Sequence, residues 1–578
     1  VVLIIVVLSG MIFSLIIIGP DLILNQLKDI YVSLTTPFGN DRWQLTVKEA
    51  HQPYLKDFIS LVTWKYFLVY MIGSVMLISG FLKGLSKKIR YGGLGIFVLF
   101  IFGFSFSRYS ENSSILNGTS FFSQNIMYFG GMLLIILSYF GYYLYAYYKD
   151  KDSFKNIRKI NKNYILILIW LFVLLIASRS ALRLLFIFST IVSILVAYFA
   201  IRSFDFSLKI KKDYYKIVVW VLLFLIFINP FSIASSFAYG LLDRGVIIDH
   251  SQTVLKVSKS AGSGYTLQWQ VAGKWVRENT DEDAVFAHWW DYGYWIQTNF
   301  ERATITDGGN SKASLNHFMA RVVLTGQNEI EALEFLKAHN ATHLLIVFNE
   351  VRKYPAFSSI GGDENWDRYS WLPPFQLDPE RTQETKDHTI YFYVGGSPVD
   401  WDFTYEGESF QKGNAIIIGF FIPIRKSDNR AIIENPVGVI FNNGKQKAIP
   451  LECIFFNGQE LNFNQSGLEG CFQILPSFKG EDVNQIGGGL YVSEKVRKTL
   501  FAQFYLFGKN GKYFRLIYND SEQMPLALYN GRMIGPLKIW EISYPENLQI
   551  PEYYYEDVLP NPNVRNLEGN FLKNLKNP

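Results

Sequence analysis

The sequence predicts a polytopic α-helical membrane region followed by a mixed α/β soluble domain with a β-rich C-terminal part. Long apolar runs lie almost entirely before residue 232. Hydrophobic residues make up 49% of the 578 residues and the mean hydropathy is +0.12, which is high for a water-soluble protein. Later segments alternate strand-like and helix-like patterns, and after residue 400 short strand-like runs separated by Asn-Gly turns dominate.

We expect seven transmembrane helices, because seven segments have ~17–25 mostly apolar residues, the length that crosses a bilayer. They are 1–19, 64–82, 91–106, 124–147, 163–178, 180–202 and 214–231. The first begins at residue 1 with "VVLIIVVLSGMIF", without an initiator Met, a basic flank or a cleavage site, so it is a poor signal peptide. The chain is therefore expected to be an N-terminally truncated piece.

Basic loops give the orientation of this region. Segments 83–90, 148–163 and 202–213 carry four, six and four Lys or Arg residues, whereas the loop 107–123 has only Arg108. The positive-inside rule places the three basic loops in the cytoplasm. The loop 20–63, the hairpin tip "ASRSALR" and everything after 231 are then extracytoplasmic. Long loops are usually functional or disordered, so we expect 20–63 to act as a lid.

The soluble part divides by pattern into residues 232–400 and 401–578. The first is expected to be mixed α/β, with a helix at 267–279, a strand "AVFAHW", a helix "EIEALEFLKAHN" and a buried strand "HLLIVF". The second is expected to be β-rich. Its predicted strands are "NAIIIGFFIPI", "GVIFNN", "CIFFNG", "LFAQFYLFG", "YFRLIYN" and "LKIWEISY".

Charge and cysteine content exclude several functions. The net charge of +5 is too small to indicate a nucleic-acid partner, and no Arg-rich stretch with interleaved aromatics occurs in the soluble part. Cys453 and Cys471 are the only cysteines, so they form neither a zinc site nor a CxxC redox motif. A single disulfide and two separate buried thiols are both consistent with this spacing.

The segment "HWWDYGYW", 288–295, surrounds one acid with aromatic rings. Such an acid needs a hydrogen-bond donor. The Trp289 and Trp290 indoles supply two donors and Asp291 supplies an acceptor, a set that matches a hydroxyl group, either of Ser/Thr in a peptide or of a sugar. An aromatic corner or a core plug is the alternative. Gly293 gives the backbone room to turn, and His288 is expected to be a strand residue with a local hydrogen bond.

"WWDYG" resembles the signature of the oligosaccharyltransferase catalytic subunit. Two further segments agree with this family. "TVKEAHQP", 46–53, is similar to its archaeal Thr-Ile-x-Glu motif, which implies that Glu49 binds the amide of the acceptor asparagine; His51 is a candidate to support Glu49. "EVRKYPAF", 350–357, resembles the Asp-x-x-Lys-x-x-x-Met/Ile element that completes the pocket for the +2 residue. Lys353 matches, whereas Glu350 and Phe357 replace the family residues.

The tip "SRSALRLL" resembles the family segment whose arginine reaches the lipid pyrophosphate, and this implies that role for Arg183, with Arg179 as a competitor. The resemblance covers most of the chain up to about residue 370. The single TVKE-type motif favours an archaeal, single-subunit member.

The resemblance implies an enzyme that moves an oligosaccharide from a dolichyl-type lipid-pyrophosphate donor to the asparagine of Asn-X-Ser/Thr. It also implies a Mn²⁺ or Mg²⁺ ion whose ligands lie mostly outside this chain, so that no metal ligand is assigned here and the chain alone is expected to be inactive. Its expected partners are the lipid-linked oligosaccharide, the acceptor polypeptide and the bilayer, in a multi-pass cell-membrane protein with an extracytoplasmic C-terminal domain.

Two other functions remain open from the residues. A non-catalytic, membrane-anchored glycan- or peptide-binding protein would use the same aromatic acid but would not need the TVKE segment. A transporter or sensor would need charged residues within its helices, and the predicted spans contain almost none.

Overall fold

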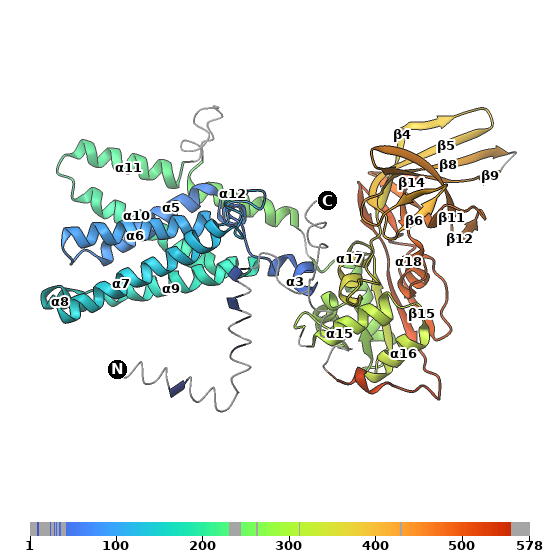
Figure 1. Ribbon diagram of the computed structural model, residues 1–578, viewed down its shortest axis with the longest axis horizontal. Helices are drawn as coiled ribbons and strands as arrows, with labels where there is room; N and C mark the ends of the chain where they lie inside the picture. The colour runs from blue at the N-terminus through green and yellow to red at the C-terminus, as the bar shows by residue number, and fades with distance from the viewer. Residues whose placement is uncertain are drawn as a thin grey trace. The chain divides into compact units, whose positions relative to one another are not determined.

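The computed structural model divides the chain into two compact units, residues 1–262 and 263–578 (Figure 1). The structure describes a few positions before residue 36 and then residues 42–229, 244–261, 264–310, 312–427 and 430–556. The predicted fold class is confirmed: long apolar helices fill the first unit, and the second is mixed α/β with a β-rich part.

Five helical segments of the first unit are long and apolar enough to cross a membrane. They are α5 (Trp64–Phe81), α6 (Lys87–Phe106), η2 with α7 (Phe122–Tyr148), α9 (Lys162–Ser180) and η3 with α10 (Leu182–Leu208). The predicted span 1–19 lies almost wholly outside the described residues. The predicted span 214–231 corresponds to α11 (Asp213–Phe227), whose 15 residues reach only about 22 Å.

The core of the first unit lies where α5, α6, α9 and α10 face one another, with Leu77, Phe97, Leu171 and Ile191 fully buried. Short helices connect the long ones. The predicted loop 20–63 contains α3 (Arg42–Thr46), η1 (Lys48–Ala50) and α4 (Leu55–Val62), and the others are α8 (Lys151–Arg158) and α12 (Val246–Ala261). Because α12 belongs to this unit, the division between units falls about 30 residues after the predicted boundary at 231.

The second unit begins with a five-stranded mixed sheet whose strand order is β15-β18-β3-β1-β2. Strand β1 (Val285–Ala287) is parallel to both β2 (Ala303–Thr304) and β3 (His343–Val347). The antiparallel strands β18 (Leu537–Ile542) and β15 (Phe514–Asn519) extend the sheet beyond β3. The predicted boundary at residue 400 therefore does not separate the two sheets, because β15 and β18, which lie beyond it, belong to the same sheet as β1, β2 and β3.

Helices surround this sheet. They are α13 (Leu267–Asn279), α14 (Gly293–Trp295), α15 (Ala313–Phe318), α16 (Glu329–Ala338), α17 (Asn349–Gly361) and the short helices η4 (Trp290–Tyr292), η5 (Ile296–Phe300), η6 (Met319–Leu324) and η8 (Glu552–Tyr554). The predicted helices at 267–279 and in "EIEALEFLKAHN", and the strand in "HLLIVF", are confirmed.

The β-rich part contains a closed ring of seven strands. The ring runs β11-β10-β8-β5-β4-β14-β13 and closes because β13 also pairs with β11. Their bounds are β4 (Pro374–Glu384), β5 (His388–Pro398), β8 (Ile416–Ser427), β10 (Val437–Asn442), β11 (Lys445–Phe456), β13 (Leu468–Lys479) and β14 (Asp482–Val492). Phe420, Phe472 and Ile454 fill its interior. Shorter strands are β6 (Phe403–Tyr405), β7 (Glu408–Phe410), β9 (Arg430–Ile433), β12 (Gln459–Asn462), β16 (Ala527–Tyr529) and β17 (Arg532–Ile534).

One predicted strand is wrong. The run "LFAQFYLFG" is helical: η7 (Ala502–Leu506) follows the short helix α18 (Glu494–Arg497). The Thr499 hydroxyl accepts a hydrogen bond from the Ala502 N–H, and Phe501, Phe504 and Tyr505 are buried. All residues of 500–507 except Gln503 are buried, and such a continuous apolar run does not distinguish a strand from a buried helix.

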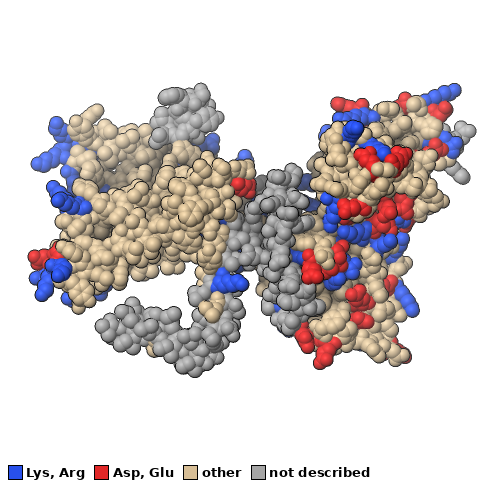
Figure 2. Space-filling model, viewed as in Figure 1, with Lys and Arg blue, Asp and Glu red and all other residues tan. Residues whose placement is uncertain are grey.

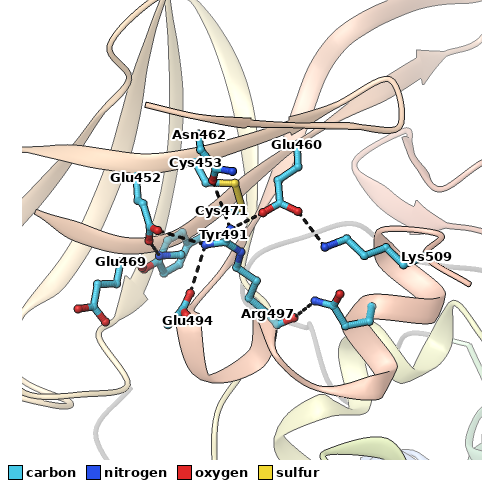
Figure 3. Close-up of a disulfide and its surroundings, with 12 residues drawn as sticks. Glu452, Cys453, Glu460, Asn462, Glu469, Cys471, Tyr491, Glu494, Arg497 and Lys509 are labelled. Atoms are coloured by element: carbon cyan, nitrogen blue, oxygen red, sulfur yellow. Dashed lines mark hydrogen bonds and ion pairs between the residues drawn. A yellow bond between two sulfur atoms is a disulfide. The ribbon is translucent and has the colours of Figure 1, made fainter. Parts of the chain in front are cut away.

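A disulfide joins Cys453 on β11 to Cys471 on β13, where the two strands are in register at the seam that closes the ring (Figure 3). This settles which of the two sequence alternatives holds. Beside the disulfide, Arg497 of α18 forms ion pairs with Glu452, Glu460 and Glu494. The seam is therefore held by a covalent bond and by charged side chains from a neighbouring helix.

Removing this disulfide should destabilise the β-rich part. In the double variant Cys453→Ser/Cys471→Ser we expect a loss of about 3 kcal/mol of unfolding free energy, because the bond closes a loop across a sequence separation of 18 residues. Thermal unfolding of the whole chain in detergent measures it, and the unmodified chain treated with a reductant is the control. Equal midpoints for the oxidised chain and the double variant would contradict the prediction.

Candidate functional site

Two adjacent parallel strands carry the motif segments that the sequence analysis singled out. Strand β1 leads into Trp289–Asp291, and β3 leads into α17, which contains Glu350 and Lys353. The carboxyl ends of parallel neighbours meet at one edge of a sheet, which is where open α/β sheets bind ligands. The parallel pairing of Phe286 with His343 thus brings together residues about 60 positions apart.

Lys353 and Asp291 form the central contact of this edge. The Lys353 Nζ lies 3.0 Å from the Asp291 Oδ2, and the two side chains are 32% and 28% exposed. The same ammonium donates to the Tyr292 hydroxyl at 3.3 Å and lies 4.7 Å from the centre of its ring. A partly exposed ion pair contributes about 1 kcal/mol or less, so this pair orients the carboxylate more than it stabilises the fold.

The tryptophans differ in exposure. Trp289 is 2% exposed and packs on Phe357, with ring centres 5.8 Å apart. Trp290 is half-buried, and its ring centre lies 6.3 Å from that of Trp289. Tyr292 is buried and stacks on Trp269. Trp290 and Asp291 are therefore the accessible members of the motif, and Trp289 and Tyr292 form the floor beneath them.

Glu350 and Phe357 lie in the core below the edge and do not line an accessible pocket. Both are 0% exposed. One oxygen of the Glu350 carboxyl accepts the Val347 N–H at 3.0 Å. Burial raises the pKa of Glu350 to about 8, against the lowering effect of Lys353. In this structure both residues lie beneath Lys353 and Trp289, so their role in a +2 pocket stays a prediction.

Gly293 is required for a close approach rather than for a turn. Its φ is ordinary, but a Cβ at this position would lie 2.4 Å from the Cβ of Asp307 and 2.6 Å from the Thr306 carbonyl oxygen. The Thr306 hydroxyl in turn donates to the His288 carbonyl oxygen at 2.9 Å. The segment after β2 is thus packed directly against the motif.

The local bond expected for His288 is confirmed. Its Nδ1 lies 2.7 Å from the Trp289 carbonyl oxygen, and its side chain is fully buried. Burial lowers the pKa of His288 to about 4, so the ring is neutral near pH 7 and Nδ1 is the donor. This bond fixes the backbone at the first residue of the motif.

The other candidate residues lie in the first unit. Glu49 is exposed on η1, and the next turn carries His51, whose Nε2 lies 3.0 Å from the Leu45 carbonyl oxygen. The His51 carbonyl oxygen accepts the Leu182 N–H at 2.8 Å. The TVKE segment is therefore bound to the tip "SRSALRLL", and η1 and η3 (Leu182–Leu184) are neighbours.

The two arginines of that tip are placed differently. Arg183 is exposed, whereas Arg179 is 2% exposed and lies over the Tyr128 ring, 4.6 Å from its centre. Exposure thus selects Arg183 as the residue that a solvent-side ligand can reach.

Arg108 is a buried cation that the sequence analysis did not single out as a site residue. It is 1% exposed, and its guanidinium lies 5.1 Å from the centre of the Tyr54 ring. Burial lowers the pKa of Arg108 to about 10, so it stays charged near pH 7. In the described part of the chain neither Arg108 nor Arg179 forms an ion pair with a carboxylate. As the only basic residue of the segment 107–123, Arg108 could have been noticed from the sequence.

Comparison with known proteins identifies the domain that contains this edge. Residues 281–396 match the family model described as the STT3/PglB/AglB core domain. This stretch, about a fifth of the chain, is thus similar to the core domain of oligosaccharyltransferases. Over 123 residues, 21% of its length, the chain is 31% identical to the dolichyl-phosphooligosaccharide-protein glycotransferase 1 of Pyrococcus furiosus. Over 236 residues, 40% of this chain, it is 28% identical to the protein of the same name from Pyrococcus horikoshii.

These alignments span 12% and 21% of the length of the two relatives, so the chain matches only a small part of either. Among solved structures, the Archaeoglobus fulgidus oligosaccharyltransferase tethered with an acceptor peptide containing the NVT sequon is similar at 14% identity and a TM-score of 0.36. That likeness covers 82% of this chain and 64% of that one. The Archaeoglobus fulgidus AglB in complex with an inhibitory peptide and a dolichol-phosphate is similar at 17% identity and a TM-score of 0.35, over 67% of this chain and 37% of that one.

Protonation of Glu350 should make stability depend on pH. Its pKa is 4.5 ordinarily and about 8 when folded. Between these values the unfolded chain has lost the proton that the folded chain retains, so unfolding free energy should fall as pH rises from about 4.5 to 8 and then level off. Glu350→Gln should remove this decline, measured as thermal midpoint against pH. The matched control is the exposed Glu282→Gln. An unchanged decline in Glu350→Gln would refute the assignment.

Proposed function

We propose that this chain acts in a membrane oligosaccharyltransferase, which transfers an oligosaccharide from a lipid-pyrophosphate donor to the asparagine of Asn-X-Ser/Thr at the extracytoplasmic face of the cell membrane. The observation that carries the proposal is the contact between Asp291 and Lys353 at the carboxyl edge of β1 and β3. This contact lies inside the residues that match the STT3/PglB/AglB core domain.

The WWDYG edge is proposed to bind the hydroxyl of the sequon. A hydroxyl needs both an acceptor and a donor, and Asp291 with the indole N–H groups of Trp289 and Trp290 supplies them. Lys353 holds one oxygen of the Asp291 carboxylate at 3.0 Å, which leaves the other oxygen to accept from the substrate. A site built for a hydroxyl rejects an isostere without one, because its own polar groups would stay unpaired. This accounts for Ser or Thr at the +2 position.

Glu49 is proposed as the catalytic residue that binds the acceptor carboxamide. The nitrogen of an amide is a poor nucleophile because its lone pair is delocalised into the carbonyl group. A carboxylate that accepts an N–H of the side-chain amide favours rotation about the C–N bond, and this rotation frees the lone pair. Glu49 is exposed on a short helix, so its carboxylate is accessible to a peptide.

Arg183 is proposed to bind the pyrophosphate of the donor. Negative charge develops on the phosphate oxygens when the glycan leaves, and a guanidinium stabilises it with charge-assisted hydrogen bonds. The contact between the His51 carbonyl and the Leu182 N–H supports this role, because it keeps the segment of Glu49 beside the segment of Arg183. A purely glycan- or peptide-binding protein would not need an acid and a phosphate ligand to be neighbours.

A divalent metal ion, Mn²⁺ or Mg²⁺, is expected in this chemistry, but the described residues do not fit one. Their only close group of three metal-ligating side chains is Cys453, Glu460 and Cys471. The two cysteines are joined in a disulfide, so they offer no thiolate ligand. We therefore assign no step to a metal held by these residues, and we propose that the described chain alone does not turn over.

Sequon recognition should depend on the hydroxyl. We expect the whole chain in nanodiscs to bind a fluorescent Asn-X-Thr peptide at least about 10-fold more tightly than its Asn-X-Val isostere, as for the loss of one hydrogen bond to a charged group. Asp291→Ala should make the two peptides equal, whereas the exposed Asp283→Ala should not. Fluorescence anisotropy measures this difference.

Glycan transfer is the second readout of the same variants. A protein that contains this chain, given the peptide, a lipid-linked oligosaccharide and Mn²⁺, should shift the peptide on a gel, and Glu49→Ala should abolish the shift. Peptide selectivity without any transfer would favour the binding-protein alternative. Equal binding of the two peptides by the unmodified chain would overturn the proposed hydroxyl site.

The two arginines of the tip should separate in their effects. Arg183→Gln should weaken binding of a lipid-pyrophosphate donor by about 10-fold or more, because one charge-assisted hydrogen bond is lost, without lowering thermal stability. Arg179→Gln should instead leave donor binding unchanged, because this side chain is 2% exposed and lies over the Tyr128 ring. Donor binding is measured by scintillation proximity in detergent. The reverse pattern would assign the phosphate contact to Arg179.

A further inference from the structure

The first unit contains a large apolar cavity at the end that carries the basic loops. Its volume is about 930 Å³, and α5, α6, α7 and α9 line it. The lining also reaches the connections between these helices, through Leu82 and Leu85 on one side and Ile157 and Ile160 on the other. The cavity therefore extends from the space between the apolar helices to the segments that connect these helices.

Cationic side chains alternate in sequence with the residues that line this end of the cavity. Lys88 and Arg90 flank the lining residue Ile89, Arg158 follows Ile157, and Lys159 precedes Ile160. Figure 2 shows Lys and Arg gathered at the end of the unit where α8 lies in Figure 1.

These cations lack acidic partners. Lys83, Lys87, Lys88, Arg158 and Lys159 are exposed, and within the described residues none of them forms an ion pair. The acids of the same loops are engaged elsewhere. Asp152 pairs with Lys155, and Asp150 caps the N–H of Ser153 at the start of α8. A row of unpaired positive charges thus borders an apolar space, and this combination is complementary to an amphiphilic anion.

We propose that this cavity binds the hydrocarbon chain of an anionic membrane lipid, whose phosphate contacts the basic residues of the loops 83–90 and 148–163. Clusters of Lys and Arg at the cytoplasmic ends of membrane helices attract anionic headgroups, and basic pockets between such helices hold them. A neutral lipid or a packed partner helix would fill the apolar space equally well but would leave the cations unused. The charge therefore decides between these occupants.

The lipid site is separate from the donor contact proposed at Arg183. The TVKE segment and the tip with Arg183 lie where α5 begins and α9 ends, whereas the basic loops proposed to hold the lipid phosphate lie at the end of α5 and the start of α9. The 18 residues of α5 make these two levels about 27 Å apart. The apolar lining extends from these loops along α9 to Ile176. The inference does not depend on the proposed transferase function.

Two glycines of α6 provide a matched pair of variants. A Cβ at Gly92 or at Gly95 would meet nothing within 4 Å, so neither substitution forces a clash. Gly92 lines the cavity and Gly95 does not. Both positions lie inside the same helix, so replacing either glycine with leucine changes helix propensity equally. Only Gly92→Leu places a side chain at the lipid site.

The experiment counts the lipid retained by the whole chain. The protein is reconstituted in an equal mixture of phosphatidylglycerol and phosphatidylcholine, extracted into mild detergent, and analysed by native mass spectrometry. We expect retention of phosphatidylglycerol to exceed that of phosphatidylcholine by about fivefold or more. Gly92→Leu should reduce the retained lipid severalfold, and Gly95→Leu should not.

A charge series tests the headgroup. The triple variant Lys88→Gln/Arg158→Gln/Lys159→Gln should lower the ratio of the two lipids to about one. The control triple Lys209→Gln/Lys211→Gln/Lys212→Gln, on a basic loop that does not line the cavity, should leave the ratio unchanged. Equal retention of both lipids by the unmodified chain would overturn the proposal, and so would equal retention by the two leucine variants. A fall in thermal midpoint for Gly92→Leu alone, in either lipid, would instead identify a surface for a packed helix.

Discussion

The parallel pairing of β1 with β3 is the constraint on which the candidate sequon site depends. Each strand has a neighbour on both sides, and all five residues of β3 are buried. Neither strand can slide or tilt without exposing this core. The segments that leave their carboxyl ends therefore start from fixed points, and the ammonium of Lys353 meets the carboxylate of Asp291 although the contact itself is weak. The buried sheet therefore makes this edge rigid, and the partly exposed ion pair only orients the Asp291 carboxylate.

The buried residues beneath Lys353 and Asp291 show why some features of the site could be predicted from the sequence and others could not. Lys353 and Asp291 could be placed together because their segments resemble motifs of one family. Glu350 and Phe357 belong to the same resemblance, yet they are buried together with Tyr354. Tyr354 and Phe357 follow Glu350 by four and seven residues, which is the spacing of residues on one buried face of a helix. Lys353 lies at the border of that face. The helical period thus indicates the burial of Glu350 and Phe357, which the resemblance to the motif does not.

Long, strongly periodic elements were predictable for the same reason, whereas long-range assembly was not. The helix 267–279 and the strand 343–347 follow from local patterns. That β18 would pair with β3 depends on a contact between residues about 190 positions apart, which no local pattern encodes. The β-rich part also reaches the site from a distance. Phe501, just before η7, packs on both Tyr354 and Phe357 and so joins the sequence beyond the ring to the floor of the edge.

Charge in the membrane unit is arranged differently at its two ends. At the end that carries the basic loops the cations are exposed. At the end with the TVKE segment, Arg108 and Arg179 are buried near each other, and each lies over a tyrosine ring without forming an ion pair in the described part of the chain. Two uncompensated buried cations are costly, and a tyrosine ring offsets only part of that cost. Arg183 of the same tip is exposed, so it can bind an anion without adding to that cost.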